Sequence, residues 1–368
     1  MSPVAAAAAK LTSAEKHIGC KLTLFASIEG VILDDQRRTY RSPPIVAMLP
    51  EVSLAETLST YASNPLAIAE KVSPHDCGVI DIEDERPVAI VTGATGSIGR
   101  WIALGLARAG YHVVLIGRDR GRGEAALAWI AQQAPQASMA LLIADLSLLS
   151  ATRDLASLIR ADYEKIHLLV NNAGVFESKP ALTSEGRDRV LATNLLSPFV
   201  LTRARLPMLR GGAPSRVVNI GSSTSDRASL DPDHLVLGNR WGMQRAYSQS
   251  KLALMMTTFA LAKRLEGSGV TANVVHPGLV ATGLVRAGGI IGLVWRALAP
   301  IALSEEEGAD TVLYVSLAPE LTAVSGAYFK ARRVVPPNPL ALDTSLVERV
   351  WIATERLVAT QPDETTRT

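Results

Sequence analysis

From Arg86 onward, short apolar runs alternate with longer segments in which apolar residues recur at helical spacing. A short apolar run between polar or glycine residues is typical of a buried strand, and apolar positions three and four residues apart are typical of a helix on a sheet. The pattern predicts strands at 88–92, 112–116, 140–144, 168–170, 216–220 and 271–275, with a seventh at 327–329. It predicts helices at 98–109, 123–133, 184–210 and from Tyr247 to Leu265.

This alternation of strand and helix is the signature of a parallel sheet with crossover helices. We therefore predict the α/β fold class: a single Rossmann-type, doubly wound parallel sheet with helices on both faces. The predicted domain spans residues 86–357 and is followed by a flexible C-terminal tail at 358–368.

Residues 1–85 lack the alternation of strand and helix patterns and carry no chemical motif. They contain an alanine run, a polar stretch with several arginines and a pair of prolines. Apolar residues at near-helical spacing predict one helix from Ser53 to Lys71, and the acidic stretch Asp81 to Glu85 is interpreted as a linker. We interpret 1–85 as an N-terminal extension, partly disordered or helical; a start codon assigned too early is the alternative.

The composition is that of a soluble globular protein, with 48% hydrophobic and 20% charged residues among 368. A net charge of +2 favours neither nucleic acid nor an acidic partner. Cys20 and Cys77 make no disulfide framework, and the scattered histidines offer no metal-ligand spacing, so we expect a reducing compartment and no metal. The longest apolar run, 288–303, is interrupted by Arg296 and Pro300 and falls short of the ~18 residues that span a bilayer. We predict a cytoplasmic protein.

The first predicted strand and helix are joined by the glycine-rich turn Thr92-Gly93-Ala94-Thr95-Gly96-Ser97-Ile98-Gly99. Glycines allow a tight turn and let a pyrophosphate approach the backbone, whose N–H groups and helix dipole stabilise the anion. A glycine-rich turn alone is a weak signal, but a position between a strand and a helix is the one that a dinucleotide requires. The turn therefore predicts a dinucleotide site.

The end of the second predicted strand indicates which dinucleotide binds. NAD sites usually place a carboxylate there, which binds the ribose 2′-hydroxyl. Gly117 occupies that place here, and the guanidinium of Arg118, which follows, suits a 2′-phosphate. Asp119 keeps NAD(H) as the second choice. We predict NADP(H) as the cofactor.

Polar and small residues follow three further predicted strands. Asp145, with Leu146 after it, is placed to bond the adenine edge or to cap the helix that starts nearby. The run Asn171-Asn172-Ala173-Gly174 follows the fourth strand, where small residues allow close approach of a cofactor. Ser222 follows the fifth; a serine there often forms a turn, but the carboxyl ends of parallel strands also border the ligand crevice.

Tyr247 and Lys251 lie four residues apart on a predicted helix and so share one face. A free tyrosine titrates near pH ~10, and a fixed positive charge nearby lowers its pKa towards the working range. The pair suits general acid–base catalysis on a hydroxyl or carbonyl. Taken alone, the same pair is better explained as part of a solvated helix face.

Pro198 falls inside the predicted helix at 184–210, four residues after Asn194. Proline lacks an N–H and crowds the carbonyl four residues back, so we predict a kink and an Asn194 carbonyl without a helical partner. Such a carbonyl would be able to hold a water near the site. A kink that serves only packing is the alternative.

As a set, these residues resemble the short-chain dehydrogenase/reductase family over about 86–357. The resemblance rests on Thr92-Gly93 with Gly99, Asp145, Asn171 to Gly174, Asn194, Ser222, Tyr247 with Lys251, and Pro277-Gly278, in the order typical of the family. The spacer between Ser222 and Tyr247, the stretch 246–253 and the stretch 304–309 are similar to the retinol dehydrogenase and protochlorophyllide reductase-like branch.

The resemblance implies a catalytic tetrad of Asn194, Ser222, Tyr247 and Lys251, in which the Asn194 backbone carbonyl holds a relay water. It also implies that Thr282 binds the nicotinamide carboxamide. The full set of predicted cofactor-binding residues is Thr92, Gly93, Thr95, Gly96, Ser97, Ile98, Gly99, Arg118, Asp145, Leu146, Asn172, Ala173, Gly174, Tyr247, Lys251, Pro277, Gly278 and Thr282.

The glycine-rich turn departs from the family's usual T-G-x-x-x-G-x-G. Ser97 stands where the middle glycine is expected, and Gly96 comes one residue early, a spacing similar to that of the family's extended branch. The other motifs do not fit that branch. We therefore expect a slightly altered pyrophosphate turn in which Ser97 adds a hydroxyl contact.

These observations predict an oxidoreductase that transfers a hydride between NADP(H) and a carbonyl/alcohol pair, with Tyr247 as general acid or base. The apolar segment 283–303, where the family has its substrate flap, favours a lipophilic small-molecule substrate. An ordinary core helix and a membrane-surface segment between Arg286 and Arg296 are alternatives for that segment. The rival function is a non-catalytic NADP-binding regulator or scaffold on the same fold. Homo-oligomerisation is left open.

Overall fold

The computed structural model describes residues 86–280 and 303–360. Eight strands form one sheet in the order β3-β2-β1-β4-β5-β6-β7-β8, parallel except for the antiparallel pair β7–β8. The strands are β1 (Val88–Thr92), β2 (His112–Gly117), β3 (Ser138–Ile143), β4 (Leu168–Asn171), β5 (Ser215–Ile220), β6 (Val270–His276), β7 (Tyr328–Lys330) and β8 (Arg333–Val334). The predicted α/β fold with a doubly wound sheet is confirmed, and β8 is an addition to it.

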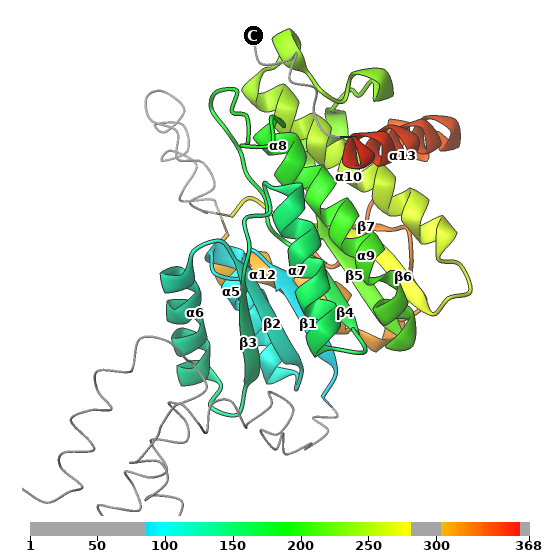
Figure 1. Cartoon of the computed structure of the whole chain (residues 1–368). Coiled ribbons are helices and arrows are strands. Elements are labelled where there is room, and N and C mark those ends of the chain that lie inside the picture. The colour runs from blue at the N-terminus through cyan, green and yellow to red at the C-terminus, as the bar shows by residue number, and fades with distance from the viewer. Residues whose placement is uncertain (1–85, 281–302, 361–368) are drawn as a thin grey trace, which may run out of the picture. The chain divides into compact units, whose positions relative to one another are not determined.

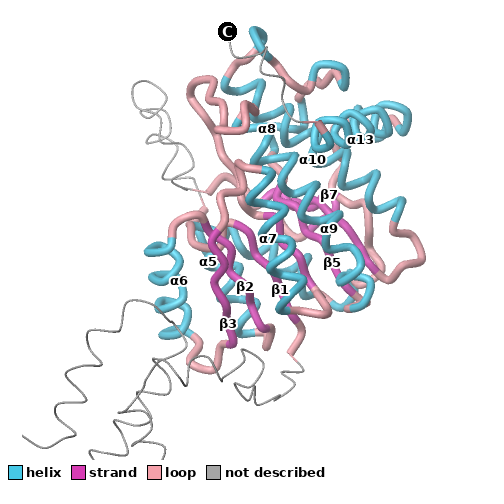
Figure 2. The backbone as a smooth tube through the Cα atoms, viewed as in Figure 1, coloured by secondary structure: helices cyan, strands magenta, loops and turns pink. Residues whose placement is uncertain are grey.

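Helices cover both faces of the sheet (Figure 1, Figure 2). One face carries α5 (Ser97–Arg108), α6 (Arg120–Gln133) and α12 (Glu305–Leu317). The other carries α7 (Leu149–Asp162), α9 (Ser197–Gly211) and α10 (Met243–Arg264), with α13 (Thr344–Ala359) packed on α10. Shorter helical segments are α8 (Arg189–Leu191), the π-helical η2 (Ala192–Leu196) and the 3-10 helices η3 (Ser223–Arg227), η4 (Pro232–His234), η5 (Gly238–Arg240), η7 (Pro319–Leu321) and η8 (Pro339–Leu342).

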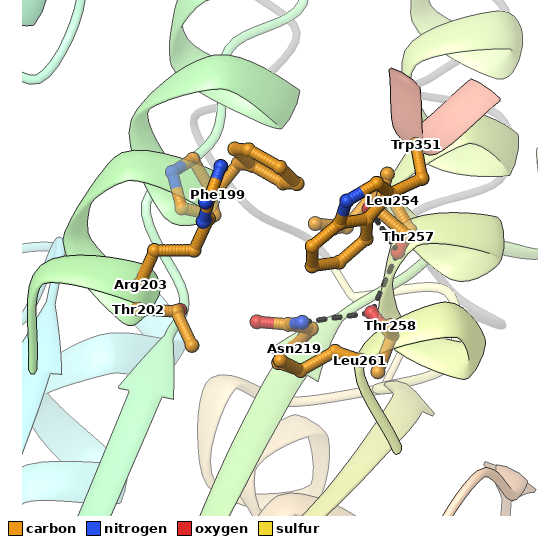
Figure 3. A pocket seen from close by; sticks show the side chains of 10 residues that line it. Phe199, Thr202, Arg203, Asn219, Leu254, Thr257, Thr258, Leu261 and Trp351 are labelled. Carbon is orange, nitrogen blue, oxygen red and sulfur yellow. Dashed lines mark hydrogen bonds between the residues drawn. The ribbon is translucent and has the colours of Figure 1, made fainter. Parts of the chain in front are cut away.

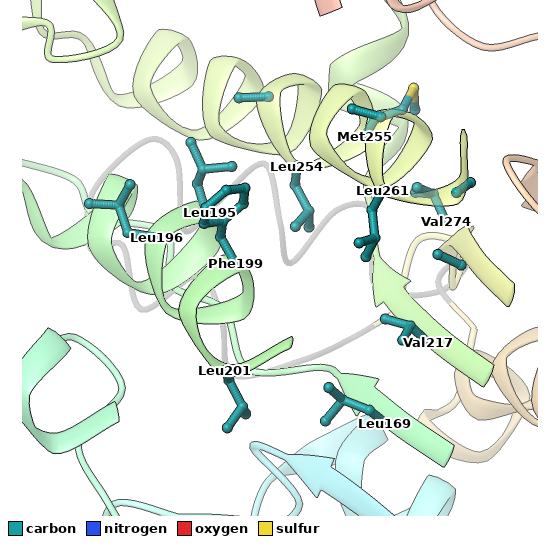
Figure 4. Close-up of a cluster of buried hydrophobic side chains, with 14 of the residues drawn as sticks. Leu169, Leu195, Leu196, Phe199, Leu201, Val217, Leu254, Met255, Leu261 and Val274 are labelled. Carbon is teal, nitrogen blue, oxygen red and sulfur yellow. The ribbon is translucent and has the colours of Figure 1, made fainter. Parts of the chain in front are cut away.

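Two apolar layers hold the helices on the sheet. Side chains alternate along a strand, so Val91 and Val275 face α5 and α12 while their neighbours Ile90 and Val274 face the opposite layer. In that layer, the strand residues Leu169, Val217 and Val274 lie beneath Leu195, Phe199, Leu254 and Leu261 of η2, α9 and α10 (Figure 4). Because both faces are covered, the strands read as continuous apolar runs in the sequence.

The predicted helix at 184–210 is wrong in its first part. A bridge between Leu182 and Asp188 closes a turn, and the helix begins only at Arg189, where the Asp188 carboxylate accepts from Leu191 N at 2.8 Å. The predicted distortion is present, but it takes the form of the π-helical η2 one turn before Pro198. Pro198 itself is the second residue of α9, which continues directly from η2, so its missing N–H falls inside a continuous helical stretch.

Helices α7, α12 and α13 were not predicted as defined elements. The first N–H groups of α7, those of Leu149 and Ser150, donate to the Glu185 carboxylate, each at 2.8 Å. Glu185 therefore performs the capping considered for Asp145, whose carboxylate instead accepts from Ser147 N at 2.9 Å. Helix α13 continues to Ala359, past the predicted domain end at 357.

Helix α13 covers the seam between α9 and α10. Trp351 packs edge-on against Phe199, with ring centroids 4.8 Å apart, and Arg203 forms an ion pair with Glu355 at 2.8 Å. Beneath these rings is a cavity of about 10 Å³, the size of one water, whose floor includes Asn219 (Figure 3). No residue of the predicted tetrad lines this cavity, so it is separate from the predicted site.

The β7–β8 hairpin turns through two non-glycine residues in the left-handed region, Ala331 with φ 44° and Arg332 with φ 59°. That region costs an L-residue about 1 kcal/mol or more, and glycine enters it freely. The Ala331→Gly change is therefore expected to raise the free energy of unfolding by roughly 0.5 kcal/mol, after the added freedom of the unfolded chain is subtracted. Urea denaturation measures this change. In the adjoining strand, Arg333→Gly should lower the stability; a loss for both variants would contradict the interpretation.

Several predicted features lie outside the described residues: the helix at 53–71, the linker at 81–85, Thr282 and nearly all of the apolar segment 283–303. Within 86–280 and 303–360, no helix is long and apolar enough to cross a membrane. The same ranges contain no group of three or more His, Cys, Asp and Glu residues arranged to hold a metal ion.

Candidate active site

The turn after β1 is a cradle built from backbone. Gly93 has φ +64°, and a Cβ at Gly99 would lie 2.2 Å from the Gly93 carbonyl oxygen, so both positions require glycine. Helix α5 begins directly after Gly96, and no side chain caps its first N–H groups. Free N–H donors and the positive end of the helix dipole favour an anion at this point. The turn therefore fits a pyrophosphate.

Ser97 opens α5 in a conformation that glycine would adopt more easily, with φ 21°. Its hydroxyl oxygen is buried and has no hydrogen-bond partner within the described part of the chain. Leaving a buried hydroxyl without a partner costs about 1–3 kcal/mol, which a ligand that bonds it would recover. An unsatisfied hydroxyl in the anion cradle is what the predicted Ser97 contact requires.

The end of β2 has no room for a carboxylate at position 117. A Cβ at Gly117 would lie 2.3 Å from the Thr95 methyl group. The Asp119 carboxylate caps α6 by accepting from Arg122 N at 2.8 Å, so it is engaged within the protein. Arg118 is exposed, and the Arg122 guanidinium reaches to 3.5 Å from a Cβ placed at Gly96. Arg122 was not predicted as a site residue, because helical spacing alone does not show that its side chain bends back over the turn.

Thr92 and Asn172 fasten the carboxyl ends of β1 and β4, where the strand order reverses. Thr92 Oγ1 accepts from Asn172 N at 2.9 Å and from Ala173 N at 3.0 Å. The Asn172 side chain donates to the carbonyls of Thr92 at 2.9 Å and Gly93 at 3.2 Å. Both side chains are thus used within the protein, and they hold the backbone rigid where a doubly wound sheet binds its ligand.

Asp145, Leu146 and Gly278 follow the parallel strands β3 and β6 at the same edge. Asp145 is exposed at the end of β3, and Leu146 is buried behind it. Gly278 follows β6 with φ +91°, and a Cβ there would lie 2.4 Å from Leu303. Leu303 N donates to Leu279 O at 2.7 Å, which brings these two residues side by side.

Three chain segments converge on the Tyr247 phenol. Tyr247 and Lys251 lie one turn apart on α10, as predicted, and are only 9% and 3% exposed. Ser222, which follows β5, is hydrogen-bonded to the phenol through its side chain. Phe176, from the loop after β4, packs edge-on against the Tyr247 ring with centroids 4.9 Å apart. The structure therefore brings Ser222, Tyr247 and Lys251 into one buried group.

The pKa of Tyr247 is shifted in the direction opposite to the one predicted from the sequence. Burial raises the pKa of Tyr247, while the hydrogen bond with Ser222 lowers it by less. Burial also lowers the pKa of Lys251 to about 8. The Lys251 ammonium donates to the Ile220 carbonyl at 2.8 Å and lies 5.9 Å from the centre of the Tyr247 ring. Removal from water, which penalises the charged form of each group, therefore outweighs the attraction between phenolate and ammonium in the protein alone.

Asn194 lies within η2 and is fully buried. Its side-chain oxygen accepts from Val175 N at 2.8 Å, and its side-chain nitrogen donates to Val175 O at 3.0 Å and to Ser250 Oγ at 3.1 Å. These bonds tie the loop after β4 to α10. The Asn194 side chain is thus occupied, which leaves its backbone carbonyl as the group for the predicted water.

A small apolar cluster near the start of α10 was not predicted from the sequence. Val190, Leu237 and Ala246 form a buried cluster against which Val175 and Trp241 pack. The Trp241 indole N–H donates to the Asp188 carboxylate at 2.9 Å. These residues come from separate segments that meet only in the folded chain, so no single stretch of sequence predicts the cluster.

Comparison with known sequences places these features in a family. The family model for short chain dehydrogenases matches residues 87–288. Retinol dehydrogenase 12 of Bos taurus is 34% identical over 297 residues, which cover 80% of this chain and 94% of that protein. Polyprenol dehydrogenase of Mus musculus is 39% identical over 278 residues, which cover 73% and 83% respectively.

Solved structures agree with this placement. An uncharacterised protein from Mycobacterium paratuberculosis matches with a TM-score of 0.61 and 29% identity, covering 76% of this chain and 96% of that one. A short-chain dehydrogenase from Burkholderia cenocepacia J2315, crystallised in complex with NADP, matches with a TM-score of 0.55 and 27% identity, covering 66% and 95%. The chain therefore belongs to the short-chain dehydrogenase family of oxidoreductases, in its retinol dehydrogenase-like branch.

Proposed function

We propose that this chain is an NADP(H)-dependent oxidoreductase that interconverts a carbonyl and an alcohol on a lipophilic small molecule. The observation that carries the proposal is the convergence of Ser222, Tyr247 and Lys251 beside the glycine-rich turn. The segment after β4 lies between this group and the turn. Its backbone bonds to Thr92 in the turn, and a Cβ at Gly174 would lie 3.5 Å from Lys251 Nζ. One short segment thus connects the acid–base group with the dinucleotide cradle.

The cradle fits a dinucleotide by its own chemistry. The uncapped start of α5 and the unsatisfied Ser97 hydroxyl would hold the pyrophosphate. Arg118 would bind a 2′-phosphate, since Thr95 fills the space beside Gly117 and Asp119 is engaged as a helix cap. These features favour NADP(H) over NAD(H).

The chain's own residues supply the proton and the positioning, while a bound nicotinamide dinucleotide would donate the hydride, with its two electrons, in reduction and accept it in oxidation. The Ser222 hydroxyl hydrogen-bonds the substrate oxygen and polarises it. The Tyr247 phenol gives its proton to that oxygen during reduction and takes one during oxidation. The charge of Lys251 stabilises the phenolate that results and offers donors to ribose hydroxyls. Burial of the group keeps water out and strengthens each of these interactions.

A lipophilic substrate follows from the surroundings of Tyr247. The ring of Phe176 packs on the phenol ring, and its neighbour Val175 belongs to an apolar cluster with Val190, Leu237 and Trp241. Apolar walls with few polar groups bind ligands mainly through apolar area. The names of two relatives support the same substrate class, because retinol and polyprenol are lipophilic alcohols.

The test is NADPH oxidation by the pure full-length protein across a panel of aldehydes and ketones of increasing chain length, with retinal included. We expect turnover that rises with apolar area, and slower turnover with NADH. If NADPH binds but no member of the panel is reduced, and no matching alcohol is oxidised, the non-catalytic regulator or scaffold becomes the better account.

The cofactor preference gives a second test. The Arg118→Ala change removes the guanidinium placed for a 2′-phosphate, and a charge-assisted hydrogen bond contributes about 1.5–3 kcal/mol. We expect KM for NADPH to rise by on the order of tenfold or more, with little change for NADH. The matched control is Arg120→Ala, in the first turn of α6, where Arg120 pairs with Glu124 at 3.9 Å. An equal loss with both cofactors would contradict a role for Arg118 at the 2′-phosphate.

A further inference from the structure

The hydroxyl of Ser222 has a second neighbour besides Tyr247. Ser222 stands at the N-cap of η3, and its Oγ accepts from Thr224 N at 3.3 Å. The Thr224 hydroxyl also donates to Ser222 Oγ, at 3.0 Å. Both bonds come from one residue, two positions along the chain, so they form as soon as η3 folds.

A serine hydroxyl has two acceptor positions and one proton to donate. With Thr224 N–H and Thr224 O–H filling the acceptor positions, the Ser222 proton is left to point away from η3. The Tyr247 phenol is within hydrogen-bonding reach of the Ser222 side chain, and its helix α10 packs against η3. Ser222 is therefore positioned to donate a hydrogen bond to a substrate oxygen that lies within reach of the Tyr247 phenol.

We propose that Thr224 is a positioning residue that fixes the Ser222 hydroxyl as a hydrogen-bond donor to the substrate oxygen. The inference rests on the proposed function, because it assumes that Ser222 polarises that oxygen. Thr224 touches neither substrate nor cofactor in this role and acts only through Ser222.

The turn that carries Thr224 is itself held firmly in place. The Asp226 carboxylate accepts from the Tyr328 hydroxyl at 3.0 Å and pairs with the Lys330 ammonium, so η3 is bonded to β7. The buried side chain of Asn338 donates to the carbonyls of Ser225 at 2.8 Å and Ala228 at 2.9 Å. Such a frame keeps the main chain of η3 in place when one hydroxyl is removed. Loss of the Thr224 hydroxyl should thus affect the orientation of Ser222 and leave the fold unchanged.

The test compares Thr224→Val, which keeps the shape and the backbone N–H but removes the hydroxyl, with Thr224→Ser, which restores a hydroxyl. For Thr224→Val we expect kcat for an aldehyde substrate to fall about tenfold, as for the loss of one hydrogen bond, with KM for NADPH and the melting temperature unchanged. Thr224→Ser should recover most of the rate. The matched control is Ser223→Ala, at an exposed position of the same turn, which should keep the wild-type rate.

A double-mutant cycle separates orientation from general damage. If Thr224 acts through Ser222, adding Thr224→Val to a Ser222→Ala protein should cost no further activity. Additive losses, or a wild-type kcat for Thr224→Val alone, would overturn the inference. The proposed function fails separately, if Ser222→Ala and Tyr247→Phe proteins both retain wild-type turnover.

Discussion

The Tyr247→Phe protein is expected to turn over lipophilic aldehydes about a thousandfold more slowly than the wild type, within the 10²–10⁴-fold range of general acid–base catalysis. The change removes one oxygen from a buried ring that stays packed against Phe176. Most of the predicted cofactor site is built by other segments, so NADPH affinity should change far less than turnover. Steady-state kinetics together with a fluorescence titration of NADPH measure the two quantities.

A matched control removes a phenol from the opposite end of the sheet. Tyr163 follows α7, and its hydroxyl bonds His112 Nε2 at 3.0 Å. The Tyr163→Phe protein should keep the wild-type kcat even if its stability falls slightly. If Tyr247→Phe retained the wild-type rate, the proposed acid–base role of Tyr247 would be rejected.

The parallel strands were the part of the fold most open to prediction. The run Val88–Thr92 was predicted with the bounds that β1 has, because a strand covered on both faces is apolar throughout and ends where polar turn residues begin. The exposed two-residue strand β8 carries no such pattern. The start of the helix at Arg189 was missed because Asp188 ends a bridged turn, a tertiary arrangement that helical spacing does not encode.

Site residues could be predicted where the local chemistry at a strand end determines the residue type. Glycines 93 and 99 were placed by the chemistry of a tight turn, and the structure shows the contacts that exclude a side chain there. Thr224, Phe176 and Arg122 could not be found in this way. Each matters through a contact that depends on loop and side-chain conformation, and their residue types are common in turns, cores and helix surfaces.

The Tyr247 and Lys251 pair shows the limit of spacing as a guide to electrostatics. Positions four apart on a helix do predict a shared face, and both residues are on α10. Spacing does not reveal how far each group is removed from water. In the structure that removal raises the pKa of Tyr247 and lowers the pKa of Lys251 to about 8, so lowering the phenol pKa requires further charge in the completed site.

Acidification is expected to destabilise the protein through His276, at the end of β6. Burial, with help from the nearby Lys330 ammonium and against the Asp226 carboxylate, lowers the pKa of His276 from 6.5 to about 4. Between these two pH values the unfolded chain binds a proton that the folded chain does not, so stability falls as the pH drops. Above pH 6.5 the contribution of His276 is fully present; below pH 4 both states are protonated and the loss is complete.

The expected loss is about 3 kcal/mol between pH 6.5 and pH 4, since each unit of pKa difference corresponds to about 1.4 kcal/mol. The His276→Asn protein, which cannot take up that proton, should lose correspondingly less stability over the same interval. His276 Nδ1 has no hydrogen-bond partner among the described residues, so the substitution removes no bond at that atom. Urea denaturation of both proteins at several pH values measures how steeply the free energy of unfolding changes with pH in each, which gives two slopes to compare. Equal slopes for the variant and the wild type would show that His276 titrates in the folded protein as it does in the unfolded chain, and that the buried histidine does not set the acid sensitivity.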